Sequence, residues 1–191
     1  MANISVERAD RLSDADLADL SETAESAIID GGGFGWLAPP PRDVLERYWR
    51  GVILVPERDL FVGRLDGAIA GSAQLVRPTR NNDARAATVT LTAHFVASWA
   101  RGQGLGRELV LAVEAAARQA GFWFLELDVR ETQEAAVRLY EAIGFERWGT
   151  NPNYAIVSGK LIAGHYYCKA LRHLRGKRVR EPHRPAGPAE S

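Results

Sequence analysis

Cysteine is nearly absent from the sequence, which contains one thiol, Cys168, among 191 residues. A single thiol cannot form a disulfide within the chain, and it cannot supply the several thiolates of a cysteine-rich zinc site. We therefore expect a protein of a reducing compartment, the cytoplasm, and we expect that no metal ion takes part in its site.

Long apolar runs are also missing. No segment approaches the roughly 20 apolar residues that a membrane-spanning helix requires. The first residues, MANISVERADRLSDAD, carry charges early and lack the apolar region of a secretion signal. These absences argue against a membrane span, a signal peptide and a membrane partner.

The chain also lacks an excess of charge of one sign. Its 24 basic and 24 acidic residues give a formal net charge of zero, which disfavours nucleic acid as a partner. Residues 172–191 depart from this balance because they are basic, rich in proline and without periodicity. We predict that they form a disordered tail beyond a domain of residues 1–171. Such a tail is usually a solvated end, with a weak contact to an acidic partner or RNA as the alternative.

What the chain does contain is a hydrophobic fraction of 46%, enough for one substantial core. Ser13 followed by Asp16 has the form of a capping box at the start of a helix. Apolar periodicity and turn residues predict a strand at 4–9, helices after Ser13 and after Pro39–Pro41, a hairpin of 60–65 and 68–76 joined by Asp66-Gly67, and a strand at 86–96.

The second half of the chain alternates helices and strands. The predicted elements are an amphipathic helix after residues 101–106 that Gly121 ends, a strand at 122–129, a helix at 134–143, and strands at 145–150 and 164–171. The order of elements predicts an α/β fold with a mixed central sheet of about seven strands and about four helices.

The sharpest local motif is the glycine turn, Arg101-Gly102-Gln103-Gly104-Leu105-Gly106-Arg107, between a predicted strand and a predicted helix. Glycines let the backbone approach an anion, and the free N–H groups and dipole of the following helix favour a phosphate there. A glycine turn before a helix is also common as structure alone. A P-loop is disfavoured because the Gly-Lys-Ser/Thr that it requires is absent here. A dinucleotide-binding fingerprint is disfavoured because Arg107 occupies the position of its third glycine.

Two motifs together resemble a known family. Arg101-x-x-Gly104-x-Gly106, between a strand ending in Phe95-Val96 and an amphipathic helix, resembles the acetyl-CoA motif of the GNAT (GCN5-related) N-acetyltransferases. Residues 138–145, reading RLYEAIGF, are similar to the second signature of that family. The resemblance covers roughly residues 4–171, and it implies the GNAT fold and an enzyme that moves an acetyl group from acetyl-CoA to a primary amine.

The resemblance also implies which residues bind the cosubstrate. Main-chain groups of His94, Phe95 and Val96 would bind the pantetheine arm where two strands diverge. Gln133 replaces an asparagine that contacts the cofactor in many members. The residues implied for the diphosphate are Arg101, Gly102, Gln103, Gly104, Leu105, Gly106 and Arg107.

Catalysis requires a base for the amine, which is largely protonated at neutral pH, and an acid for the sulfur. Tyr140 lies where the family has the tyrosine that protonates the leaving thiolate, although it could also be a core residue. Residues 127–130, LDVR, resemble the segment of the ribosomal-protein alanine acetyltransferases whose glutamate is a general base, which falls on Asp128 here. A turn cap or an ion pair with Arg130 is the alternative for Asp128.

Other candidate bases are weaker. Glu126 shares a strand face with Asp128, although an ion pair is its more common role. His94 could act as a base, but strand histidines are more often packed or paired. Thr90 occupies the position of the base in histone-type members and cannot serve.

The acceptor is indicated only by aromatic residues. Trp36, Tyr154 and Tyr166 are candidates for the wall of its pocket, with ordinary core packing as the alternative. Residues 35–39, GWLAP, resemble a stretch of GNATs related to tabtoxin-resistance proteins, which favour small molecules. We therefore expect the acceptor to be the amine of a small molecule, with a protein N-terminus or a lysine as the alternative acceptor. The alternative to an enzyme is a regulatory module that binds CoA without catalysis. A homodimer is compatible with the sequence.

Overall fold

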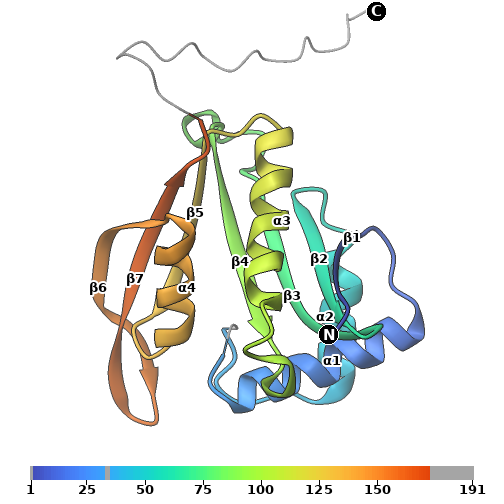
Figure 1. Cartoon of the computed structure of the whole chain (residues 1–191). Coiled ribbons are helices and arrows are strands. Elements are labelled where there is room, and N and C mark those ends of the chain that lie inside the picture. The colour runs from blue at the N-terminus through green and yellow to red at the C-terminus, as the bar shows by residue number, and fades with distance from the viewer. Residues whose placement is uncertain (1, 33–34, 173–191) are drawn as a thin grey trace, which may run out of the picture.

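The computed structural model describes residues 2–32 and 35–172, and this part of the chain folds into a seven-stranded sheet with helices on both faces (Figure 1). The strands are β1 (Ile4–Ala9), β2 (Arg58–Leu65), β3 (Ala68–Val76), β4 (Thr88–Val96), β5 (Phe124–Arg130), β6 (Glu146–Val157) and β7 (Lys160–Ala170). The helices are α1 (Asp14–Ile29), α2 (Arg42–Val52), α3 (Leu105–Gln119) and α4 (Glu134–Ile143). The predicted α/β fold and its order of elements are confirmed.

The sheet is mixed, in the order β1-β2-β3-β4-β5-β7-β6. β4 and β5 are its parallel pair, and the other neighbouring strands in the described chain are antiparallel. One face carries α3 and α4, and the other carries α1 and α2. Each face buries its own apolar core, around Leu109 and Val113 of α3 on one side and around Leu20 and Trp49 on the other.

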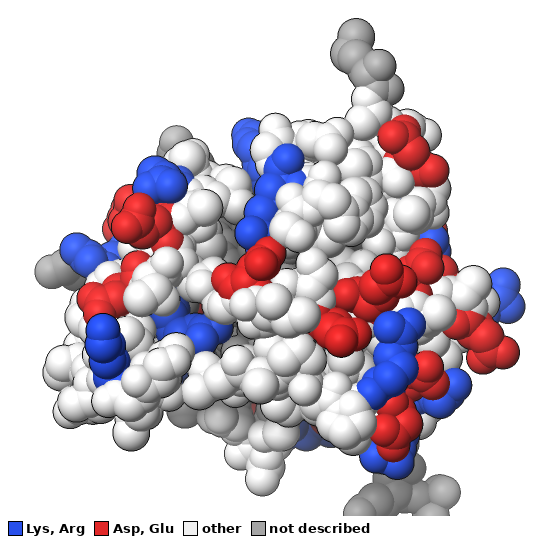
Figure 2. All heavy atoms as spheres, turned by 90° about the horizontal axis from the view of Figure 1, so that it is seen from below, with Lys and Arg blue, Asp and Glu red and all other residues white. Residues whose placement is uncertain are grey.

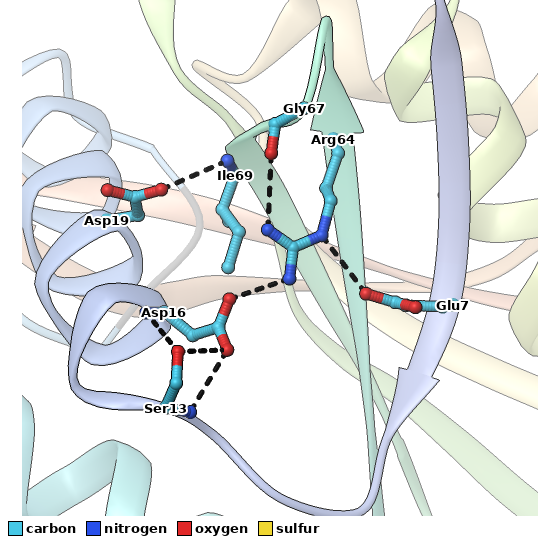
Figure 3. A network of polar contacts seen from close by, with 7 residues as sticks. All are labelled: Glu7, Ser13, Asp16, Asp19, Arg64, Gly67 and Ile69. Carbon is cyan, nitrogen blue, oxygen red and sulfur yellow. Dashed lines mark hydrogen bonds and ion pairs between the residues drawn. The ribbon is translucent and has the colours of Figure 1, made fainter.

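The start of α1 is held by a polar network that also reaches the sheet (Figure 3). The Ser13 hydroxyl accepts a hydrogen bond from the Asp16 N–H at 3.1 Å, and the Asp16 carboxylate accepts one from the Ser13 N–H at 3.0 Å. Arg64 of β2 then donates to Asp16 at 2.6 Å and to Glu7 of β1 at 3.0 Å. Burial opposes the charge of Asp16, but the bonds from Arg64 and Ser13 outweigh it and lower its pKa. The predicted capping box is confirmed.

Two hairpins use the same turn chemistry, and only one of them was predicted. Asp66 and Gly67 both have positive φ, 51° and 93°, as the turn between β2 and β3 requires. Ser158 and Gly159, with φ of 50° and 76°, make an equivalent turn between β6 and β7. The predicted ends of these two strands were therefore wrong, since both strands continue to this turn. The polar residues 151–154 resemble a loop in sequence but pass through β6 as an irregularity in its pairing.

β4 and β5 pair over a short distance and then diverge, as their ribbons do in Figure 1. Their pairing runs from Thr88 to Thr90 and from Phe124 to Glu126, although β4 continues to Val96 and β5 to Arg130. Beyond the pairing, β4 contains a bulge at which Ala93 has a φ of 47°. The divergence leaves an opening in the middle of the sheet.

The surface is mixed in charge. On the face seen from below in Figure 2, acidic and basic side chains are interspersed beside a broad uncharged area, as expected for zero net charge. Among the described residues, none of the helices combines the length and the apolar character needed to cross a membrane. The predicted tail lies outside the described residues, apart from Arg172.

Candidate active site

Two cavities lie in the opening between β4 and β5. One, which we call the turn cavity, has a volume of about 490 Å³ and borders the glycine turn. The other, which we call the strand cavity, has a volume of about 340 Å³ and borders the end of β5. Among the described residues, His94, Gln133 and Ala136 line both cavities. The two spaces therefore share one wall.

The backbone conformation of the turn favours glycine at two positions, and the absence of side chains there leaves open space beside the turn. Gly102 and Gly104 have φ of 77° and 92°, a region that side chains with a Cβ rarely adopt. A Cβ added at either residue would meet no described atom within 4 Å. Leu105 begins α3, so the first N–H groups of the helix lack acceptors within it. In the part of the chain that the structure describes, the turn thus presents donors that the helix itself does not pair, beside free space.

The wall of the turn cavity includes much of the predicted diphosphate site. The predicted residues that line it are Arg101, Gly102, Gly104, Leu105 and Gly106. Gln103 and Arg107 are exposed and, within the described structure, lie outside this wall. The Arg107 guanidinium lies 3.6 Å from the Glu108 carboxylate.

The opposite wall comes from the end of α1, which the sequence did not indicate. Ala27, Asp30 and Gly32 line the turn cavity, and the Asp30 carboxylate lies 3.1 Å from the Arg101 guanidinium. Arg101 also donates from Nε to the Val96 carbonyl at 3.4 Å. This arginine therefore bridges α1 and the end of β4.

Gln133 lies in both cavity walls, but its side chain is engaged with the backbone. Its amide and the Arg130 guanidinium both donate to the Gly31 carbonyl, the latter at 2.8 Å. These bonds join the end of α1 to β5 and to the start of α4. They hold together three segments that surround the opening.

The predicted pantetheine segment lies on the free side of β4. His94, Phe95 and Val96 line the turn cavity. The Ala97 N–H donates to the Ala70 carbonyl of β3 at 2.8 Å, so the preceding Val96 N–H faces the other way, toward the opening. A main-chain donor is therefore directed into the space between the diverging strands.

Asp128 lies in the wall of the strand cavity and accepts a hydrogen bond from the Tyr154 hydroxyl. Burial, followed by this bond and the charge of Asp128, raises the pKa of Tyr154. Tyr154 itself packs over Gly164 of β7, where an added Cβ would overlap its ring. Gly35 and Leu37 also line this cavity.

Tyr140 is buried on α4 and reaches the shared wall. Its hydroxyl lies 2.9 Å from Nδ1 of His94, and Nε2 of His94 lies 3.1 Å from the Gly106 carbonyl oxygen. Burial lowers the pKa of His94 to about 4, although the bond to Gly106 opposes this shift. Burial and then the charge of Asp128 raise the pKa of Tyr140. Both groups are therefore uncharged at neutral pH.

Three residues predicted as a base or as acceptor contacts lie outside the described walls of both cavities. Glu126 forms an ion pair with Arg85 and is absent from the described walls of both cavities. Trp36 packs edge-on against Tyr48, with ring centres 5.2 Å apart, although its neighbours Gly35 and Leu37 line the strand cavity. Tyr166 packs behind Tyr154, with ring centres 6.3 Å apart. Sequence periodicity could not separate these residues from Asp128 and Tyr154.

Comparison with known proteins gives a consistent result. The sequence model of the acetyltransferase (GNAT) family matches residues 19–145. A protein of Azospirillum brasilense with the name "Uncharacterized N-acetyltransferase in hisH-hisA intergenic region" is 62% identical over 133 residues, which are 70% of this chain and 79% of that protein.

Solved structures share the fold at low sequence identity. The N-acetyltransferase from Staphylococcus aureus Mu50 superposes with a TM-score of 0.76 at 21% identity, over 89% of this chain and 99% of that chain. A GNAT superfamily phosphinothricin acetyltransferase from Sinorhizobium meliloti, solved in complex with acetyl-CoA, gives a TM-score of 0.76 at 19% identity, over 94% of this chain and 93% of that one.

Proposed function

The chain belongs to the GNAT acetyltransferase family, and on that basis we propose that it transfers the acetyl group of acetyl-CoA to the primary amine of a small molecule. The observation that carries this proposal is the shared wall of the two cavities. Main-chain donors border the turn cavity, and the Asp128 carboxylate borders the strand cavity. Tyr140 also lines the strand cavity, with its hydroxyl 2.9 Å from Nδ1 of His94, which lines both.

The turn cavity fits the diphosphate and pantetheine of acetyl-CoA. The open space at Gly102 and Gly104 and the N–H groups at the start of α3 suit an anion, and no metal ion is needed to hold it. Bound acetyl-CoA supplies an activated thioester carbonyl. The Val96 N–H, which faces the opening, is the candidate donor that polarises this carbonyl.

Asp128 is the proposed base. It takes a proton from the acceptor amine, directly or through water, so that the nitrogen lone pair can form the new C–N bond. The hydrogen bond from Tyr154 fixes the carboxylate within the cavity wall. Glu126 is a poor alternative because Arg85 neutralises it away from the cavity.

Tyr140 is the proposed acid. As the C–S bond breaks, its hydroxyl gives a proton to the leaving sulfur, and the proton taken by Asp128 returns to the phenolate through solvent. The Tyr140 hydroxyl is protonated at neutral pH, as an acid must be, and the burial that raises its pKa means that it releases its proton only to a strongly basic partner such as the developing thiolate. The step therefore forms one amide and one thiol and restores both residues.

The size of the strand cavity favours a small acceptor. Its volume of about 340 Å³ lies within the range of small-molecule sites, which is about 300–1,000 Å³. Gly35 and Leu37 stand on one side of it and Tyr154 and Ala155 on another. A protein N-terminus or a lysine side chain is the alternative acceptor, and it would need an open groove beside β6 and β7.

The test is release of free thiol from acetyl-CoA in the presence of a panel of small amines, peptides and proteins. Turnover with a small amine, absent with peptides, supports the proposal, and the reverse pattern supports the protein acceptor. Binding of acetyl-CoA without thiol release for any amine would favour the regulatory module.

The catalytic assignment is tested by Asp128→Asn, with Glu126→Gln as the matched control on the same strand. We expect kcat to fall about 100-fold for Asp128→Asn and to change less than about twofold for Glu126→Gln. Tyr140→Phe should lower kcat at least about tenfold. Full turnover by Tyr140→Phe would remove its role as the acid.

A further inference from the structure

We propose that His94 is a positioning residue that connects the glycine turn to Tyr140. Its imidazole holds the phenol hydroxyl through Nδ1 and is itself fixed by the Gly106 carbonyl through Nε2. The inference rests on the proposed role of Tyr140 as the acid. In this role the His94 side chain positions Tyr140. It does not act as a base, and the role is separate from any contact that the main chain of His94 makes with the cosubstrate.

The two hydrogen bonds determine the state of the ring. A carbonyl oxygen can only accept, so the 3.1 Å bond to Gly106 places a hydrogen on Nε2. In the neutral ring Nδ1 then has a lone pair, and the 2.9 Å bond is donated by the Tyr140 hydroxyl. The pKa of about 4 agrees with a neutral ring at physiological pH. His94 therefore acts as an acceptor toward Tyr140 and is a poor base.

The bulge in β4 brings His94 to the correct face. Leu91 belongs to the core under α3, whereas Phe95 belongs to the core under α1 and α2. In a regular strand these two residues would share a face, because side chains alternate. The extra residue near Ala93 changes the alternation, so His94 points to the α3 and α4 side. Without the bulge, His94 could reach neither Gly106 nor Tyr140.

The link spans three elements of the fold. Gly106 lies in the first turn of α3, His94 on β4 and Tyr140 on α4. His94 also lines both cavities. Acetyl-CoA bound at the glycine turn would therefore fix the carbonyl of Gly106 and, through the two hydrogen bonds, the imidazole of His94 and the hydroxyl of Tyr140.

The arrangement leaves the proton of Tyr140 free to be transferred. A neutral imidazole nitrogen is a weaker acceptor than an anionic sulfur, because hydrogen bonds to ionised groups are about twice as strong as neutral ones. Rotation about the phenol C–O bond therefore turns the O–H bond from Nδ1 toward the sulfur as negative charge develops there, and the proton then passes from the phenol oxygen to the sulfur. His94 thus positions the phenol oxygen before the transfer, and its hydrogen bond to the hydroxyl is given up as the proton leaves.

Two substitutions separate the two bonds. His94→Asn can keep an acceptor near the position of Nδ1 but loses the bond to Gly106. His94→Gln can keep a donor near the position of Nε2 but loses the acceptor for Tyr140. We expect His94→Gln to lower kcat about tenfold with the Kd for acetyl-CoA within about twofold. His94→Asn loses the bond to Gly106 that fixes the side chain, and we expect it to lower kcat as well, but by less. An unchanged kcat in His94→Gln would overturn the proposal.

A double-mutant comparison distinguishes this role from general structural damage. In a Tyr140→Phe background, adding His94→Gln should change kcat less than about twofold. A full tenfold loss in that background would overturn the positioning role while leaving the acid role of Tyr140 intact. Full turnover by Tyr140→Phe alone would instead overturn both.

Nitrogen-15 NMR of histidine-labelled protein provides a readout that does not require activity. We expect His94 to show a protonated Nε2 and an unprotonated Nδ1 whose resonance moves in Tyr140→Phe. A protonated Nδ1, or a resonance that Tyr140→Phe leaves unchanged, would contradict the proposed hydrogen bond.

Discussion

Tyr154 of β6 donates a hydrogen bond to the carboxylate of Asp128 on β5, although β7 lies between these two strands. The contact is possible because β7 has Gly164 beneath the Tyr154 ring. Gly164 pairs with Arg130 on β5 and with Asn151 on β6, so the ring crosses the sheet at the end of the strand cavity. The orientation of the proposed base therefore depends on two residues from the last hairpin.

Removing the Tyr154 hydroxyl should impair catalysis. Tyr154→Phe leaves the Asp128 carboxylate without its donor, and we expect kcat/KM for the amine to fall about 3- to 10-fold. Tyr166→Phe is the matched control, because Tyr166 packs against Tyr154 but lies outside the described wall of the cavity. Steady-state kinetics at saturating acetyl-CoA measure both. Equal losses in the two variants would show that the Tyr154 hydroxyl has no specific role.

Filling the space at Gly164 should destabilise the hairpin. A methyl group in Gly164→Ala would overlap Tyr154, and we expect the free energy of unfolding to fall by about 1–3 kcal/mol. Gly149→Ala is the control, since its nearest atom, Cβ of Tyr166, is 4.0 Å away. Urea unfolding measures both variants. A stable Gly164→Ala protein would mean that Tyr154 can move away from Asp128 at little cost.

Binding at the glycine turn can be separated from backbone strain. Gly104 and Gly67 have nearly the same φ, 92° and 93°, but Gly67 lies in the hairpin between β2 and β3. Alanine at either position should lower the free energy of unfolding by about 1–2 kcal/mol, because both residues have a left-handed backbone conformation that a Cβ disfavours. We expect only Gly104→Ala to weaken acetyl-CoA binding, by about tenfold in calorimetry. Equal affinities for the two variants would place the diphosphate elsewhere.

The neutral state of His94 predicts a pH dependence of stability. Its pKa is about 4 in the folded protein and near 6.5 when unfolded, so the unfolded chain binds more protons between these values. Stability therefore rises with pH from about 4 to 6.5, and the contribution of this residue, up to about 3 kcal/mol, is lost as the pH falls.

Urea unfolding of the wild type and His94→Asn across this range measures the effect. The free energy of unfolding of the variant should depend less steeply on pH, because up to one fewer proton is taken up on unfolding. Identical slopes would mean that the His94 ring titrates normally in the folded protein.

Much of the fold could be predicted because its signals are short in range. The capping box at Ser13 and the turn at Asp66-Gly67 each act within a few residues, and both are present. The ends of β6 and β7 were predicted less well, since the polar segment of 151–154 interrupts the pairing with β7 but remains within β6 because the strand pairs on both sides of it, at Asn151 and at Ala155. Local composition cannot report such pairing.

The candidate site was predictable in part. Residues of the glycine turn, Asp128 and Tyr140 were indicated by motifs, and the structure brings them around two adjoining cavities. Trp36 and Tyr166 were chosen for their residue type, and they pack beside the strand cavity instead of lining it. Asp30 of the turn cavity had no motif, because it comes to the site through contacts with segments about 70–100 residues away.

By itself, the sequence determined the order of helices and strands, the left-handed turn that only glycine accepts easily, and the residue types that can move protons. These properties depend on neighbours along the chain. The tertiary structure alone decided that His94 joins α3 and α4, because one extra residue in β4 reverses which face its side chain occupies. It also decided that Tyr154 reaches Asp128, because a glycine on the intervening strand leaves room for the ring.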